Sequence, residues 1–403
     1  MNRARHRGSC VLVACLLAVG CGRVDPRWRA APDRPSTVSP SSLDGAPARV
    51  ALGAEHLRGD RLSEAAAAFR SALHADSACT EALLGLAIVA SRTGEDRAAL
   101  VLTEAAWRLD PGNPRVANVA ALALLQGDRP ADAAVMLERA IDRAPSHFAL
   151  RLNAAMARAR AGDLKAAEEH LARASAISSG AIAPRLLLID LRLRAGRAAE
   201  AVSAAEALSR ERPEDPRARE ALGRALRAAG RPHEALATFN EAERLAPAWA
   251  PASIGAGWAA LETGDAGAAR DRFRRALEIT PSAWAASLGL AEALSALGDT
   301  DSGLRIYEGL LLEPPAPATA LNNVAWSRIR SGDVSEEVLD LAREAVDLDP
   351  GHASYLDTLG WGLHRAGRTR EALPFIEEAV RRAPGNRTIS AHLEEALRAA
   401  SER

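Results

Sequence analysis

Residues that could do chemistry are few in this sequence of 403 residues, and their spacing matches none of the common catalytic or metal-binding motifs. The nine histidines are scattered, with no H-E-x-x-H motif, cysteine pair or EF-hand loop. The stretch GAGWAA, Gly255–Ala260, superficially resembles a dinucleotide fingerprint, but no strand is expected before it. Acidic pairs such as Glu168–Glu169 and Glu394–Glu395 fall on expected helical surfaces. We therefore expect no enzymatic activity, no metal and no cofactor.

A cysteine near the N-terminus carries the most specific chemical signal. Three arginines among the first seven residues precede an apolar run, Cys10–Gly20, which is typical of a secretory signal and too short to span a bilayer. The run ends in LLAVGC, which resembles the bacterial lipobox, although Ala18 stands where leucine is usual. This resemblance implies that Cys21 is diacylated after cleavage. The alternative is an ordinary cleaved signal with an incidental cysteine.

The segment after this cysteine differs in composition from the rest of the chain. It is rich in proline, serine and arginine and shows no helical periodicity, which predicts a disordered tether. Cys79 is the one cysteine beyond residue 21, so an internal disulfide framework is not expected. The sequence thus predicts a signal peptide at 1–20, a tether at 21–45, a folded region at 46–386 and a capping helix at 387–403.

Proline and glycine recur with a period of 34 residues through the folded region. Glycines stand every 34 residues from Gly162 to Gly332, and Gly367 follows after 35. Prolines follow the same spacing from Pro213 to Pro315 and again near the end of the chain. A fixed period of this length predicts a repeat architecture, in which each repeat is one supersecondary unit that stacks on its neighbours.

Within one period the pattern resembles the tetratricopeptide repeat. That family has Leu-Gly at positions 7 and 8, alanine at 20, an aromatic residue at 24, alanine at 27 and proline at 32. The period from Pro216 supplies these residues as Leu222, Gly223, Ala235, Phe239, Ala242 and Pro247. The resemblance implies an all-α fold, a right-handed superhelical solenoid of about ten helix-turn-helix repeats, each made of a helix A and a helix B.

The repeats are expected to begin near Ala46, Thr80, Pro114, Phe148, Ile182, Pro216, Ala250, Trp284, Ala318 and Ala353. The first and ninth are expected to carry one extra residue in the turn between their helices. The fifth is weak, because Ile189 and Leu208 stand where small residues are expected.

Two glycines inside an expected helix, Gly360 and Gly362, indicate a close approach between helices. A glycine within a helix costs about 1 kcal/mol relative to alanine. By the resemblance, Gly360 occupies position 8, where helix A crosses helix B of the same repeat, and any longer side chain would separate them.

Tryptophans recur at position 9 of helix A. Reading this position through repeats seven to ten gives Trp258, Glu292, Trp326 and Trp361, in a sequence with only 3% aromatic residues. By the resemblance, positions 2, 5, 9 and 12 line the concave groove. Two interpretations remain open. The indoles pack between neighbouring repeats, or they form an apolar stripe that receives a peptide, an amphipathic helix or a sugar chain.

Arginines gather on helix A of the sixth repeat. Arg217, Arg224 and Arg227 occupy positions 2, 9 and 12 and could hold a carboxylate or phosphate through bidentate contacts, with Glu220 as the one acidic residue among them. The alternative is a solvated arginine face. The net charge of −1 gives no general reason to expect nucleic acid as a partner.

The C-terminal repeats, at Leu321–Asp333 and Leu356–Arg368, resemble those of bacterial envelope lipoproteins associated with exopolysaccharide and exosortase (PEP-CTERM) systems. This resemblance implies a lipid-anchored, periplasm-facing scaffold that binds a protein or peptide segment in its groove and serves biogenesis or export of an envelope component. Gly22 after the cysteine favours the outer membrane over the inner one. The alternatives are an assembly factor for a pilus or secretin machine, and direct carbohydrate binding by the groove tryptophans.

Overall fold

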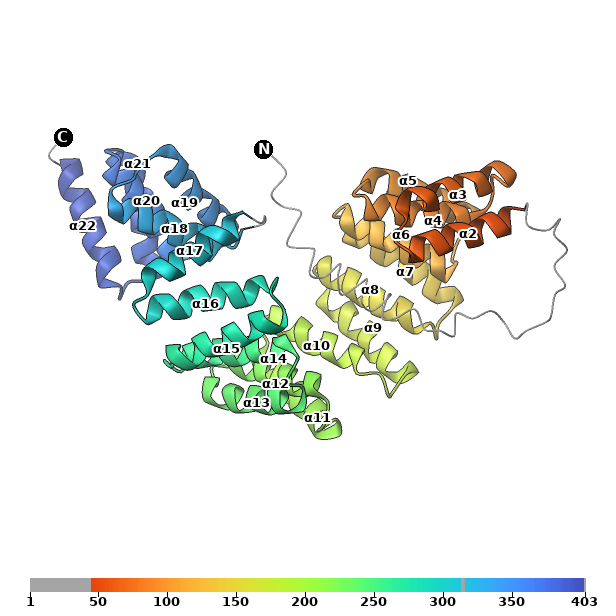
Figure 1. Cartoon of the computed structure of the whole chain (residues 1–403), viewed down its shortest axis with the longest axis horizontal. Helices are drawn as coiled ribbons and strands as arrows, with labels where there is room; N and C mark the ends of the chain where they lie inside the picture. The colour runs from red at the N-terminus through yellow and green to blue at the C-terminus, as the bar shows by residue number, and fades with distance from the viewer. Residues whose placement is uncertain (1–44, 313–315, 402–403) are drawn as a thin grey trace. The chain divides into compact units, whose positions relative to one another are not determined.

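The computed structural model describes residues 45–312 and 316–401, which form 21 helices and no strand (Figure 1). The predicted all-α class is therefore confirmed. The predictions of a signal peptide, of lipidation at Cys21 and of a tether fall outside the described residues, apart from Gly45 at the end of the predicted tether.

The chain divides into two compact units, and the division falls after Arg197. The first unit contains nine helices: α2 (Ala46–Arg58), α3 (Leu62–Ala75), α4 (Thr80–Arg92), α5 (Asp96–Leu109), α6 (Pro114–Gln126), α7 (Pro130–Arg143), α8 (Phe148–Arg160), α9 (Leu164–Ile177) and α10 (Ala183–Arg194).

The second unit contains the remaining twelve described helices. These are α11 (Ala198–Glu211), α12 (Pro216–Ala228), α13 (Pro232–Leu245), α14 (Ala250–Glu262), α15 (Ala266–Ile279), α16 (Trp284–Ala296), α17 (Thr300–Leu311), α18 (Ala318–Ser331), α19 (Glu336–Leu348), α20 (Ala353–Arg365), α21 (Thr369–Arg382) and α22 (Arg387–Ser401).

The even-numbered helices from α2 to α20 begin where the repeats were expected to begin, except that α10 begins one residue later, at Ala183. The turn of the ninth repeat has four residues, 332–335, and so carries the expected extra residue. The same expectation for the first repeat is wrong, because its turn, 59–61, has the usual three residues. Asp60 takes the left-handed backbone there (φ 58°), at the place where most other repeats have glycine, so this turn closes without an insertion.

Helix A ends with a glycine in most repeats because the backbone turns into the left-handed region. Gly162, Gly264 and Gly367 have φ of 85°, 84° and 81°. No heavy atom lies within 4 Å of where a Cβ would stand at any of the three, so backbone conformation rather than space requires glycine. This accounts for the recurring glycine that reveals the period.

A second set of glycines makes room for the aromatic residue of helix B. A Cβ on Gly223 would lie 2.7 Å from Cε1 of Phe239, and one on Gly255 of the next repeat would lie 2.2 Å from the same atom. Phe239 is fully buried. The ring thus sits between two helices A, and Phe69 and Phe273 are held in the same way.

The two glycines of α20 have different neighbours. A Cβ on Gly360 would lie 2.5 Å from Cγ1 of Ile376 in helix B of the same repeat, as expected for the crossing point. A Cβ on Gly362 would lie 2.8 Å from both Ile329 and Leu339, which belong to the preceding repeat. Gly360 therefore serves packing within a repeat, and Gly362 serves packing between repeats.

Successive helices A pack side by side in the second unit, with one exception. Helix α12 contacts α14, α14 contacts α16, α18 contacts α20, and α20 contacts α22. Helices α16 and α18 do not approach each other this closely, although both contact α17. The A-helix face therefore opens between the eighth and ninth repeats.

Candidate functional site

The position-9 residues do not form one continuous exposed stripe, because Trp361 lies beneath the last helix. Trp361 is only 8% exposed, and its ring stacks on His392 of α22 at 4.0 Å between ring centroids and 15° between planes. His392 Nδ1 in turn lies 2.9 Å from Oδ1 of Asp357. The structure therefore favours packing as the role of this tryptophan.

Trp258 is also engaged by its own unit. Its ring meets Phe273 edge-to-face with centroids 5.3 Å apart, and the guanidinium of Arg227 lies 5.9 Å from its centroid. The guanidinium and the phenyl ring that lie against the indole occupy two of the surfaces that a ligand would use. Trp258 therefore also acts mainly as a packing residue.

Trp326 differs from the other two because it lines an open pocket of about 440 Å³ where α16 and α18 diverge. The indole is half-buried and lies 5.9 Å from the ring of His392. The other lining residues combine one aliphatic side chain with hydroxyl, amide and guanidinium groups: Ser295, Thr300, Leu304, Tyr307, Asn323, Ser327, Arg330 and Ser331. We call this the Trp326 pocket.

Tyr307 lines the pocket and is almost fully buried, with 3% exposure. Burial, together with the negative charge of nearby Glu292, raises the pKa of Tyr307 to about 12, while hydrogen bonds with Asn323 and Ser295 act in the opposite direction. The phenol therefore stays protonated at any ordinary pH and serves as a hydrogen-bonding group.

Glu292 is the position-9 residue of the eighth repeat, and it is not one of the residues that line the pocket. Burial raises the pKa of its carboxyl group. It makes no hydrogen bond or ion pair with any residue in the described part of the chain. Close by in the lining, Asn323 accepts a hydrogen bond from Nδ2 of Asn322, whose own Oδ1 is buried and receives no hydrogen bond from the described residues.

The three arginines of α12 are each held by an acidic neighbour. Arg217 Nη2 lies 2.7 Å from Asp215, Arg224 Nε lies 2.8 Å from Glu220, and Arg227 Nε lies 2.9 Å from Glu262. The hydrogen bond from Arg217 holds the pKa of Asp215 below its ordinary value. The structure therefore does not bring these arginines together as an uncompensated cationic cluster.

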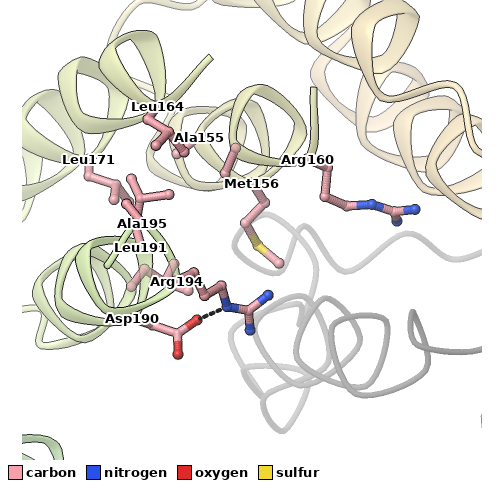
Figure 2. A pocket seen from close by; sticks show the side chains of 11 residues that line it. Ala155, Met156, Arg160, Leu164, Leu171, Asp190, Leu191, Arg194 and Ala195 are labelled. Atoms are coloured by element: carbon pink, nitrogen blue, oxygen red, sulfur yellow. Dashed lines mark ion pairs between the residues drawn. The ribbon is translucent and has the colours of Figure 1, made fainter. Parts of the chain in front are cut away.

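A second pocket lies in the first unit among α8, α9 and α10, with a volume of about 280 Å³ (Figure 2). Leucines of α9 and α10 line it together with Met156, which is the position-9 residue of the fourth repeat. At its edge Arg194 pairs with Asp190 at 2.8 Å, the contact marked by the dashed line in Figure 2. It is more apolar than the Trp326 pocket.

Sequence reasoning named Trp326 but missed the residues that make its surroundings polar. Tyr307 belongs to helix B and fell outside the groove positions. Glu292 was visible as the one interruption of the tryptophans at position 9, and that break in the pattern was the available signal. A charged residue at a position that is tryptophan in the other C-terminal repeats indicates that this position has different neighbours in the eighth repeat.

Within residues 45–312 and 316–401, no three histidine, cysteine, aspartate or glutamate side chains gather as the ligands of a metal ion would. In the same residues no helix combines the length and the apolar character needed to cross a bilayer.

Paired helices of this size, a glycine-and-aromatic packing rule and a 34-residue period define a helical-repeat protein. Two family models, both described as tetratricopeptide repeat, match the sequence. One covers residues 118–182 and 186–248, and the other covers residues 56–123 and 260–321. Together they span more than half of the chain, which therefore belongs to the tetratricopeptide repeat proteins.

The chain is also similar to solved structures. A tetratricopeptide repeat protein from Parabacteroides merdae is 15% identical, with a TM-score of 0.50, and the match covers 62% of this chain and 98% of that one. Yeast Tom70 is 14% identical, with a TM-score of 0.44, and the match covers 89% of this chain and 96% of that one. The likeness to the Parabacteroides merdae protein shows the fold alone. No functionally curated protein matches the sequence.

Proposed function

We propose that this protein is an adaptor that binds a polypeptide partner at the A-helix face of its second unit, with the Trp326 pocket as the centre of contact. The observation that carries the proposal is the opening between α16 and α18, because it leaves an indole accessible beside hydroxyl, amide and guanidinium groups. Aromatic side chains with a polar surround are typical anchors of protein interfaces. The proposal assigns no catalytic step to the chain.

The proposal extends to location and process. Diacylation of Cys21 would tether the repeats to a membrane facing the periplasm, the outer one rather than the inner, and the partner would belong to the biogenesis or export of an envelope component. Two sequence features support this extension: the lipobox-like LLAVGC, and the resemblance of Leu321–Asp333 and Leu356–Arg368 to repeats of envelope lipoproteins. An assembly role for a pilus or secretin predicts a different partner, and carbohydrate binding predicts a polysaccharide in place of a protein.

Affinity purification from the native host tests the proposal, with Trp326→Ala compared with Trp284→Ala. Trp284 is 52% exposed and does not line the pocket, so it controls for loss of an indole. We expect Trp326→Ala to release a protein partner that Trp284→Ala retains. Equal recovery with both folded variants, or a polysaccharide as the sole bound species, would contradict the proposal. A partner from an export apparatus would favour the export role, and a pilus or secretin subunit would favour the assembly role.

A further inference from the structure

Arg330 is exceptional among the arginines on the A helices from α12 to α20. Every other arginine on these helices contacts an acidic side chain or an aromatic ring: Arg217, Arg219, Arg224, Arg227, Arg328 and Arg365. Arg330 is exposed, lines the Trp326 pocket and makes neither kind of contact with the described residues. A guanidinium without a counter-ion at a pocket is suited to binding an anion from outside.

The residues that α18 contributes to the pocket share one side of that helix. Asn323, Trp326, Ser327 and Arg330 all line the pocket, and they are spaced i, i+3, i+4 and i+7. The indole N–H of Trp326, the hydroxyl of Ser327 and the guanidinium of Arg330 make no hydrogen bond with the described residues. All three groups can donate a hydrogen bond, and the indole N–H and the guanidinium cannot accept one. This side of α18 therefore presents donors to whatever enters the pocket.

The rest of the lining fits a carboxylate carried on a short aliphatic stem. No aspartate or glutamate is among the described residues that line the pocket, so a bound anion meets no negative charge there. A carboxylate can accept two hydrogen bonds from a guanidinium and still has lone pairs for a hydroxyl and an indole N–H. Leu304 and the ring of Trp326 offer apolar surface to the methylene groups of the stem.

We propose that the Trp326 pocket receives an acidic side chain of the partner polypeptide, with its carboxylate bound by Arg330 and by the indole N–H of Trp326. This inference rests on the proposed function and specifies the chemistry of the partner. Ser327 donates a further hydrogen bond to the same carboxylate. Because Arg330 repels basic side chains, the site selects an acidic segment over a basic one.

The test uses the purified full-length chain and an acetylated and amidated Gly-Gly-Glu-Gly-Gly peptide at constant ionic strength. The matched peptide carries glutamine, which keeps the shape of the side chain and removes its charge. A third peptide carries glutamine and a free C-terminus, so it offers a terminal carboxylate in place of a side-chain one. Binding is followed by the NMR shift of the Trp326 indole N–H, assigned by its loss in Trp326→Phe. The variants are Arg330→Gln and, as the control for charge, Arg244→Gln on the exposed surface of α13.

We expect saturable shifts, with a Kd in the millimolar range, for the glutamate peptide in the parent chain and in Arg244→Gln. Binding should be at least tenfold weaker in Arg330→Gln and for both glutamine peptides. Glu292→Gln removes a negative charge that acts on Tyr307 of the pocket, so this variant should bind the glutamate peptide at least as tightly as the parent.

Equal binding of the glutamate peptide and the amidated glutamine peptide, unchanged binding in folded Arg330→Gln, or no saturable shift at all would overturn the inference. Tighter binding of the peptide with a free C-terminus would overturn the choice of a side chain as the source of the carboxylate. Capture of a native partner separates the two proposals. A partner that binds the folded Arg330→Gln chain as tightly as the parent contradicts the acidic-side-chain site and leaves the adaptor role standing. The absence of any protein partner contradicts the adaptor role itself.

Discussion

At the scale of single residues, this fold depends on where side chains are missing. Glycine at position 8 of one repeat and at position 6 of the next leaves space for one phenyl ring, which then touches both helices A. Glycine normally destabilises a helix. At these positions the stabilisation from packing the ring exceeds the cost in helix propensity. The same small groups explain why alanine dominates the buried positions.

Replacing Gly257 by alanine tests this packing directly. Its Cβ would lie 2.7 Å from Cε1 of the fully buried Phe273. We expect a net loss of about 1–3 kcal/mol in unfolding free energy, because overpacking exceeds the gain in helix propensity of about 1 kcal/mol. Urea unfolding followed by circular dichroism measures it.

The matched control is Gly309→Ala in α17, where nothing lies within 4 Å of the new Cβ. This variant keeps the propensity gain without the clash, so its urea midpoint should rise. A fall in both variants would show that glycine is needed for backbone conformation, and a rise in both would show that the phenyl ring has room to move.

Glu292 gives a prediction with a defined pH dependence. Burial raises the pKa of this carboxyl group, so the folded state binds its proton more tightly than the unfolded state does. Its contribution to stability is therefore complete below the unfolded pKa and is lost as the pH rises through the folded value. Glu292→Gln should melt at a temperature about 2 °C higher than the parent at pH 7. At pH 3.5 the two chains should melt at the same temperature.

Thermal melts at both pH values, with Glu278→Gln as the control, measure this difference. A lower melting temperature for Glu292→Gln at pH 7 would mean that the charged carboxylate stabilises the free protein. In that case the carboxylate has a partner within the chain.

At the scale of elements, α22 acts as a closing helix rather than as a polar ending alone. Its His392 stacks on Trp361 and meets Asp357, so the last helix shields an indole and a carboxylate that would otherwise face solvent at the end of the stack. The terminal member of a repeat array has a free face to protect, and this contact is how α22 protects it.

Replacing His392 by alanine should expose Trp361 and leave Asp357 without its partner. We expect a red shift of tryptophan emission and a loss of about 1–3 kcal/mol in unfolding free energy. His233→Ala provides the control, because His233 lies exposed on α13. An unchanged emission spectrum in a folded His392→Ala chain would indicate that α22 does not depend on this contact.

Much of the element level was readable from the sequence, and some of the site was not. Period and capping residues place a helix to within a residue, as at Pro216 and Ala250, because glycine and proline act locally. The Trp326 pocket depends on how far α16 and α18 diverge, which is set by the packing of α17 between them and leaves no periodic trace. Position 9 identified Trp326 but could not separate it from Trp361, whose cover comes from another helix.

At the scale of the whole molecule, the fifth repeat is where the two units divide, with α10 assigned to the first and α11 to the second. Ile189 and Leu208, both buried, replace the small residues that the family pattern has at these positions. The departure from the pattern and the division of the chain thus fall in the same repeat.

Membrane attachment, which we propose to occur through a lipid on Cys21, is also a property of the whole chain. We expect a fraction of the protein from its native host to carry a diacylated cysteine by mass spectrometry and to sediment with membranes. Cys21→Ser should move it to the soluble fraction, because the change removes the thiol that would carry the lipid. Membrane sedimentation that survives this change would contradict the lipid anchor.

The central claim, that the opening beside Trp326 is where a polypeptide partner binds, is tested most directly by photocrosslinking in the native host. A photoreactive amino acid at Ser327 in the pocket is compared with the same amino acid at Glu278 on the exposed surface of α15. The account predicts one discrete protein adduct from residue 327, none from residue 278, and loss of the adduct when Trp326 is changed to alanine. Equal labelling from both positions, or an adduct that forms equally well in Trp326→Ala, would contradict this claim.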